Sequence, residues 1–313
     1  MIGTQFTASE SLRGWVPRLV VRRWLWFLAT MTWGLMALGS ATRVMEAGLA
    51  CPDWPLCFGQ ILPAQQMDVQ VFLEWFHRLV AATVGCGVLI LVGMAWGWRS
   101  HLPRWLPWGA TAALGLVLWQ GILGGLTVTQ LLRFDIVTAH LGTGLAFFSL
   151  LLTLAVALLE IPAVTQPLPR FSPGFALVAT LIVYGQSLLG GLVASRWAAH
   201  QCFLGRELCQ VLHWHLLGLI PATLVTLGVG VITLRQKRVV PGLGRLGHGV
   251  LMLLALQIGV GVATYQLRLQ VEPLTVTHQA VGALLLGSLV VLTVSLQRMT
   301  RQATPSPISP STI

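Results

Sequence analysis

Eight runs of apolar residues divide this chain of 313 residues, and they decide which folds are open to it. A helix of about 20 apolar residues crosses the hydrocarbon core of a bilayer, because it satisfies its own backbone hydrogen bonds there. The chain is 55% hydrophobic and only 9% charged, which excludes an ordinary soluble domain. We therefore predict an all-α integral membrane protein with eight transmembrane helices, over residues 24–42, 71–97, 105–128, 137–159, 174–195, 209–234, 247–266 and 274–297.

Basic residues in the short connections indicate how these helices are oriented. Thirteen arginines and lysines fall on one side of the predicted membrane, and five fall on the other. The positive-inside rule then places both termini in the cytoplasm. The net charge of +10 is explained by this topology, so we expect no nucleic-acid partner.

Small-residue motifs repeat in alternate runs. The first run ends in Gly39-Ser40-Ala41-Thr42, and a Gln-x-x-x-Gly motif follows in the third, fifth and seventh runs, at Gln120, Gln186 and Gln257. Close helix packing alone is an alternative explanation of the glycines. The loops also alternate between long and short, which predicts two four-helix bundles related by a pseudo-twofold axis along the membrane normal. The predicted segments are a cytoplasmic N-terminal segment 1–23, halves 24–159 and 174–297, a linker 160–173 and a disordered tail 298–313.

Four of the five cysteines lie in or beside the long outer loops. Cys51 and Cys57 share the first loop, and Cys202 and Cys209 share or border the third. Both pairs face an oxidising compartment in the predicted topology, so we expect two local disulfides, Cys51–Cys57 and Cys202–Cys209.

Histidines stand near the outer end of every even-numbered run: His77, His140, His213 with His215, and His278. A single histidine in a membrane helix is more often a packing residue than a ligand. Histidines at four matching depths predict two pairs of facing imidazoles, the arrangement that ligates a six-coordinate haem. A zinc or copper site is the alternative, but it favours converging ligands with help from thiolates or carboxylates.

His213 and His215 cannot both ligate the same iron, because residues two apart point to nearly opposite sides of a helix. We prefer His213, since Gln210-x-x-His213 parallels Glu74-x-x-His77 and its depth matches that of His140 and His278. Gly218, three residues beyond His215, argues for the alternative.

Glu74 breaks the symmetry of the two halves. It stands three residues before His77 and so lies on the same helical face, where the other half has the neutral Gln210. A salt bridge to Arg78 is a purely structural explanation. The functional interpretation is a carboxylate beside a haem, able to accept a proton or to stabilise a cationic intermediate. Arg43 and Arg78 are candidate partners for haem propionates.

Together these motifs resemble the haem A synthase family over residues 24–297. The resemblance rests on Gly39 to Arg43, on Cys51-Pro-Asp-Trp-Pro-Leu-Cys57, on Glu74-x-x-His77-Arg78, and on the later His140, His213 and His278. It implies a bacterial plasma-membrane oxidoreductase that converts the C8 methyl group of haem O to a formyl group by successive hydroxylations, making haem A for terminal oxidases.

The resemblance also implies roles for the residues. Glu74 would be the catalytic acid, His77 and His140 would ligate the substrate haem iron, and His213 and His278 would ligate a haem b cofactor, with both sites toward the outer face. Trp214 departs from the pattern, because it stands where Arg78 stands in the second run. Expected partners are haem O, membrane lipid, haem O synthase and an electron acceptor. The alternatives are a di-haem protein that oxidises quinol and a haem transporter or chaperone.

Overall fold

The computed structural model describes residues 8–160, 172–194, 210–236 and 241–303. These residues form helices and connections, with no β-strand among them. Within the same residues, eight helices are long and apolar enough to cross a membrane. The predicted all-α membrane fold is thus confirmed.

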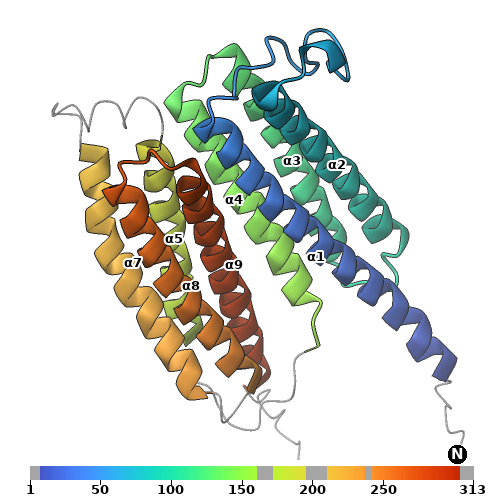
Figure 1. Ribbon diagram of the computed structural model, residues 1–313. Helices are drawn as coiled ribbons and strands as arrows, with labels where there is room; N and C mark the ends of the chain where they lie inside the picture. Colours follow the sequence, from blue (N-terminus) through green and yellow to red (C-terminus); the bar gives the residue numbers. More distant parts are fainter. Residues whose placement is uncertain (1–7, 161–171, 195–209, 237–240, 304–313) are drawn as a thin grey trace, which may run out of the picture. The chain divides into compact units, whose positions relative to one another are not determined.

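Two compact units divide the chain, at residues 1–159 and 160–313. Each contains four of the long helices (Figure 1). The first unit has α1 (Ala8–Val44), α2 (Val69–Gly97), α3 (Leu106–Thr129) and α4 (Phe134–Ala157), with a short 3-10 helix, η1 (Ala64–Gln66), before α2. The second unit has α5 (Ser172–Val193), α7 (Gln210–Arg235), α8 (Pro241–Gln266) and α9 (Glu272–Ala303).

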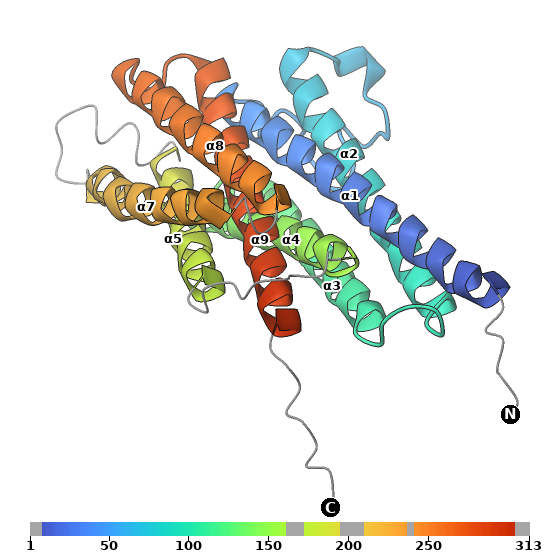
Figure 2. The ribbon, with the colours of Figure 1, turned by 90° about the horizontal axis from the view of Figure 1, so that it is seen from below.

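The helices of each unit contact one another in a closed cycle. In the first unit α1 packs on α2, α2 on α3, α3 on α4 and α4 on α1; in the second the cycle runs α5, α7, α8, α9 and back to α5. Figure 2 shows α1 alongside α2. Each unit is therefore a four-helix bundle, and the predicted axis relating the two halves stays a prediction.

Two predicted boundaries are wrong, because helices continue beyond their apolar runs. Helix α1 begins at Ala8 and not at residue 24, and α9 continues to Ala303, so residues 298–303 are helical and not part of a disordered tail. Val21 is fully buried in the N-terminal extension. Arginine and glutamine are good helix formers, so the end of an apolar run does not end a helix.

Close backbone approach and helix caps fix the packing within each unit. A Cβ added to Gly247 of α8 would lie 3.0 Å from the Gly230 carbonyl oxygen of α7, so only glycine allows these two helices to meet so closely. In the first unit the Trp24 indole N–H donates to the Gly87 carbonyl at 2.9 Å, which ties α1 to α2. The Asp68 side chain caps α2 by accepting from the Val71 N–H at 2.8 Å.

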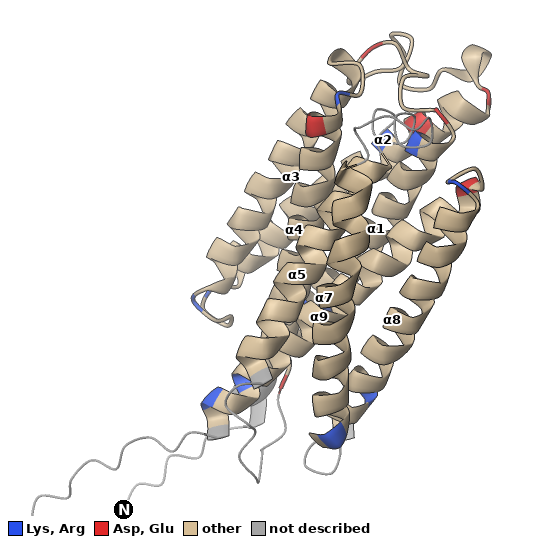
Figure 3. Cartoon of the chain, turned by 90° about the vertical axis from the view of Figure 1, so that its left-hand side faces the viewer, with Lys and Arg blue, Asp and Glu red and all other residues tan. Residues whose placement is uncertain are grey.

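Charged side chains concentrate at the helix ends. Figure 3 shows long uncharged helix bodies between ends that carry most of the acidic and basic residues. This pattern is the one expected of helices that cross a hydrocarbon layer.

Candidate functional site

The two predicted histidines of the first unit each pack against a glycine of the preceding helix. A Cβ added to Gly39 of α1 would lie only 2.8 Å from Cε1 of His77 on α2. A Cβ added to Gly124 of α3 would lie 3.7 Å from Cε1 of His140 on α4. His77 and His140 also interact electrostatically, so the bundle brings the two imidazoles toward each other.

The second unit repeats this contact with His215 and His278. A Cβ added to Gly190 of α5 would lie 3.0 Å from Cε1 of His215 on α7, and one added to Gly261 of α8 would lie 2.8 Å from Cε1 of His278 on α9. His215 and His278 interact electrostatically, as the first pair does. The glycine of each odd-numbered predicted run therefore makes room for the histidine of the run that follows.

This arrangement corrects the preference for His213. The structure brings His215 to Gly190 and His278, whereas the His213 side chain is exposed. Two residues along a helix correspond to a rotation of about 200°, so the two rings point in nearly opposite directions. The structure thus favours the alternative, His215, as the partner of His278.

All four histidines have a ring nitrogen without a partner. Nδ1 of His77, His140, His215 and His278 is buried and makes no hydrogen bond. A histidine that serves only packing is normally hydrogen-bonded when buried. These rings, paired across a bundle and seated on glycine, fit axial ligands of a haem in each unit.

Among the residues that the structure describes, no three His, Cys, Asp or Glu side chains come together as metal ligands. A haem iron needs only two ligands from the protein, because the porphyrin supplies the others.

Glutamines attach three of the four histidine positions to the neighbouring helix. The Gln120 amide donates to the His140 carbonyl at 3.1 Å, and the Gln186 amide donates to the His215 carbonyl at 2.6 Å. Nε2 of Gln257 lies 3.3 Å from Nε2 of His278. These amides lie against three further glycines, Gly144, Gly218 and Gly282. The repeated Gln-x-x-x-Gly motif therefore holds the histidine helix as well as making room for the ring.

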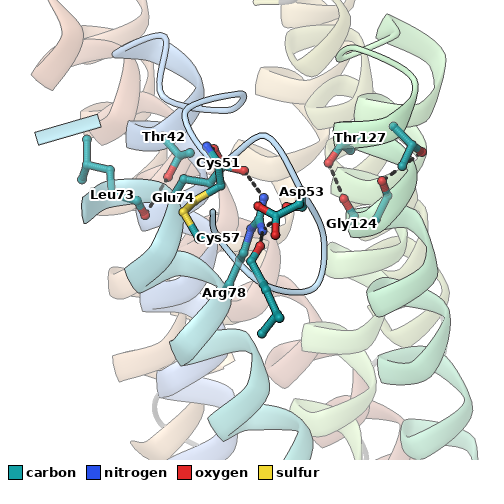
Figure 4. A network of polar contacts seen from close by, with 12 residues as sticks. Thr42, Cys51, Asp53, Cys57, Leu73, Glu74, Arg78, Gly124 and Thr127 are labelled. Carbon is teal, nitrogen blue, oxygen red and sulfur yellow. Dashed lines mark hydrogen bonds and ion pairs between the residues drawn. A yellow bond between two sulfur atoms is a disulfide. The ribbon is translucent and has the colours of Figure 1, made fainter. Parts of the chain in front are cut away.

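Glu74 is buried at the start of α2, with 4% of its surface exposed, and both its oxygens are engaged. Oε2 accepts a hydrogen bond from the Cys51 N–H at 2.8 Å, and Oε1 forms an ion pair with Arg78 (Figure 4). The salt bridge considered from the sequence is therefore present. Glu74 also fixes the first outer loop to α2, a contact that the sequence did not reveal.

Arg78 attaches the same loop through its other nitrogen. Nη1 donates to the Asp53 carbonyl at 2.6 Å and to the Leu56 carbonyl. The guanidinium is thus occupied by protein acceptors, which does not support its predicted role as a propionate partner. Arg43, in the last turn of α1, is partly buried, and its propionate role stays a prediction.

The first outer loop contains the predicted disulfide, Cys51–Cys57. Both cysteines are buried and pack against Val71 of α2. Across the bundle, the Trp54 ring lies against Gly125 of α3, where an added Cβ would come within 3.2 Å of it. The loop therefore bridges α2, which carries His77, and α3, which packs on the His140 helix α4. The second predicted disulfide, Cys202–Cys209, lies outside the described residues.

The repeated small-residue motifs of the sequence mark the places where the histidine rings lie, and packing alone does not explain them. Gly39 begins the Gly-Ser-Ala-Thr motif, and the other three glycines end the Gln-x-x-x-Gly motifs. His140 and His278 are each followed four residues later by a glycine that contacts a glutamine amide. His215 has the corresponding glycine three residues later, at Gly218. The loop contacts of Glu74 and Trp54 had no signal, because they depend on how the loop folds back.

Comparison with known proteins agrees with this architecture. Residues 22–290 match the model of a family described as cytochrome oxidase assembly protein. A Heme A synthase from Shewanella oneidensis is 33% identical over 186 residues, which cover 54% of this chain and 55% of that protein. One from Erythrobacter litoralis is 27% identical over 223 residues, covering 59% and 65%.

A longer match extends over most of the chain. A Heme A synthase from Rhizorhabdus wittichii is 25% identical over 317 aligned positions, covering 85% of this chain and 91% of that protein. The first two matches span only about half to two thirds of those relatives, whereas the family match includes all eight membrane-crossing helices at least in part. The chain therefore belongs to the COX15-CtaA family of cytochrome oxidase assembly proteins.

Proposed function

We propose that this protein is a haem A synthase, an oxidoreductase that converts the C8 methyl group of haem O to a formyl group by successive hydroxylations. The observation that carries the proposal is the pair of matched histidine sites: among the residues that the structure describes, only the first has a buried carboxylate three residues before a histidine of the same helix. Two similar histidine pairs suit two porphyrins, and the buried acid of the first site marks the porphyrin that is chemically altered. The names of its relatives, Heme A synthase, agree with this assignment.

The N-terminal unit is the proposed substrate site. His77 and His140 would ligate the iron of haem O, each from a ring that rests on a glycine. Glu74 stands three residues before His77, so its carboxylate lies toward the same face of α2. In that position it can accept a proton from the substituent or balance positive charge that develops on it. Any such role requires one of its two present partners, Cys51 N–H or Arg78, to share it.

The C-terminal unit is the proposed cofactor site. His215 and His278 would hold a haem b, which when bound supplies one-electron oxidation and reduction. The change from methyl to formyl is an oxidation, so electrons must leave the substrate site and pass to an acceptor. The polar pair of the first unit is missing here: when His215 is aligned with His77, Leu212 and Leu216 stand in the places of Glu74 and Arg78.

The charge pattern supports the proposed membrane setting. With thirteen basic residues on one side and five on the other, the termini are cytoplasmic and the histidine sites lie toward the outer face of a bacterial plasma membrane. The lipophilic substrate haem O would arrive through the membrane, from haem O synthase as a partner.

The test is expression in cells that make haem O, followed by extraction and chromatographic separation of the haems. We expect haem A and its hydroxylated precursor from the native chain. A folded, haem-loaded protein that yields neither product contradicts the proposal.

The substitution Glu74→Gln separates a role of Glu74 in the reaction from its role in attaching the first outer loop. The amide oxygen can still accept the Cys51 N–H, whereas the negative charge is gone. We expect haem loading to stay near the native level and the formyl product to be lost. Unchanged product would remove Glu74 from the reaction and leave it only as the attachment of the loop.

A di-haem protein that passes electrons from quinol is the second candidate. One observation favours it: both oxygens of Glu74 already have protein partners, as expected of a purely structural acid. It predicts fast reduction of both haems by a soluble quinol and no chemical change in either.

A further inference from the structure

The first outer loop carries an exposed apolar surface that none of the proposed chemistry uses. We define this surface as Phe58, Ile61 and Leu62 of the loop together with Val69 and Phe72 at the start of α2. Ile61 is 84% exposed, Val69 64% and Leu62 53%, while Phe58 and Phe72 are about equally half-exposed. We propose that this surface is inserted in the outer interface of the lipid bilayer, so that the disulfide loop is anchored to lipid and does not stand in water.

The first argument is depth. The Trp75 indole N–H donates to the Ile61 carbonyl at 2.7 Å, so Ile61 lies beside Trp75. Trp75 is six residues past Val69, about 9 Å along the helix axis. Side chains lean toward the N-terminus of a helix, which brings the indole back by part of a turn. Ile61 therefore lies roughly one turn inside the apolar length of α2, and not beyond its end.

The second argument is the aromatic group beside the loop. Phe72 and Phe76 stack with ring centroids 5.4 Å apart, and Trp75 lies 6.2 Å from Phe72 and 6.4 Å from Phe76. Phe72 and Phe76 are both exposed. Aromatic residues, tryptophan above all, gather at the level of lipid headgroups, where the ring is in apolar surroundings and the N–H finds a polar partner. Trp75 finds this partner in the loop.

The third argument is charge. From Phe58 to Met67 the chain has no Asp, Glu, Lys or Arg. The acids on either side, Asp53 and Asp68, are used within the protein: Asp53 accepts from the Phe58 and Gly59 N–H groups, and Asp68 caps α2. An uncharged segment whose exposed apolar side chains continue the exposed apolar side of a membrane helix fits lipid better than it fits a charged protein partner.

The backbone turn also directs Phe58 outward. Phe58 has φ +53°, which a bulky L-residue rarely adopts, and Gly59 has φ +67°. The two hydrogen bonds to Asp53, at 2.6 and 2.8 Å, hold this turn. An unfavourable conformation that leaves a phenylalanine exposed makes physical sense where the ring meets an apolar medium.

Spin labels on the loop test the proposal with the full-length protein in phosphatidylcholine and phosphatidylglycerol vesicles. Cys86, the unpaired cysteine of the described chain, is first replaced by alanine. A label is then attached at Ile61→Cys, and in a matched variant at Gln65→Cys, an exposed polar position of η1 in the same loop. Collision rates with molecular oxygen, which partitions into lipid, and with a water-soluble nickel chelate are measured for both.

We expect the label at position 61 to favour oxygen over nickel several-fold relative to the label at position 65. A ratio at position 61 that favours the water-soluble nickel chelate would place the surface in water and overturn the proposal. Low rates with both reagents at position 61 would mean that protein covers the surface, which overturns it equally. If Ile61→Cys lacks the Cys51–Cys57 bond by mass spectrometry of its peptides, Leu62→Cys takes its place with the same expectations.

Discussion

Four glycines contact the histidine rings, and we call them the histidine seats: Gly39, Gly124, Gly190 and Gly261. Replacing each by alanine tests the geometry of both sites with one chemical change. The seats differ in space: an added Cβ would meet a ring carbon at 2.8 Å at Gly39 and Gly261, at 3.0 Å at Gly190 and at 3.7 Å at Gly124. The 2.8 Å distances are shorter than real Cβ contacts, so the ring or the helix must shift; 3.0 Å is tight, and 3.7 Å is an ordinary contact. We expect damage in that order, with Gly124→Ala close to native.

The size of the effect follows from how far the ring must move. At Gly39 and Gly261 the imidazole must shift by about 0.6 Å to reach the 3.4 Å at which ordinary contact begins. Ligands at functional sites must generally be held to within about 0.5 Å, so this shift is enough to weaken iron ligation. Overpacking costs about 1–3 kcal/mol, against up to about 1 kcal/mol gained from the better helix propensity of alanine.

Haem content per polypeptide, with the optical spectrum of the reduced protein, is the measurement. Each helix supplies its own control: Gly34 of α1, Gly121 of α3, Gly185 of α5 and Gly259 of α8 have nothing within 4 Å of an added Cβ. We expect these controls to bind haem as the native protein does. Gly39→Ala should lose haem from the N-terminal unit alone and Gly261→Ala from the C-terminal unit alone.

Two results would refute the reasoning. If Gly39→Ala binds as much haem as Gly34→Ala, the His77 ring does not depend on the space that Gly39 leaves for it. If Gly124→Ala loses as much haem as Gly39→Ala, the loss comes from altered helix packing and not from the distance to the ring.

Three further predictions concern the second unit and the loop. His215→Ala should lose the C-terminal haem and His213→Ala should keep it, by the same optical assay; the opposite result would restore the preference for His213. Arg78→Gln should lower the free energy of unfolding by ~3 kcal/mol, because it leaves the buried Glu74 without its ion partner, and Arg78→Lys should restore part of the loss in the same denaturation experiment. Cys57→Ser should cost ~2 kcal/mol through the short loop that the disulfide closes, again by denaturation, and an unchanged midpoint would mean that Glu74 and Arg78 hold the loop without it.

The helices and the depth of the histidines along them could be predicted because each depends on local sequence. An apolar run of about 20 residues has one stable conformation in a bilayer, whatever its neighbours. His77, His140 and His278 lie at a similar depth because each stands near the outer end of its apolar run. The helix ends at Ala8 and Ala303 were missed because hydropathy reports where lipid ends and not where hydrogen bonding ends.

The choice between His213 and His215 depends on rotation about the helix axis, which a single helix does not determine. Matching Gln210 to Glu74 used spacing within one helix and gave the wrong register. The contact that fixes the register is between helices, from Gly190 and Gln186 on α5 to His215 on α7. The choice required the motifs of two neighbouring helices to be compared, and Gly218 was the residue of the sequence that pointed to His215.

When His215 and not His213 is aligned with His77, the surroundings of His77 differ from those of the other three histidines. His140, His215 and His278 each have a glutamine four residues before their glycine on the facing helix, whereas the corresponding position for His77 is Leu35. His77 is also the one histidine of the four with an acid three residues before it and an arginine immediately after it. Its helix is held by Glu74 and Arg78 through the disulfide loop, where the others are held by an amide. In the described residues, a histidine ring therefore packs on glycine in both units, whereas the disulfide loop and the Glu74–Arg78 pair distinguish the surroundings of His77.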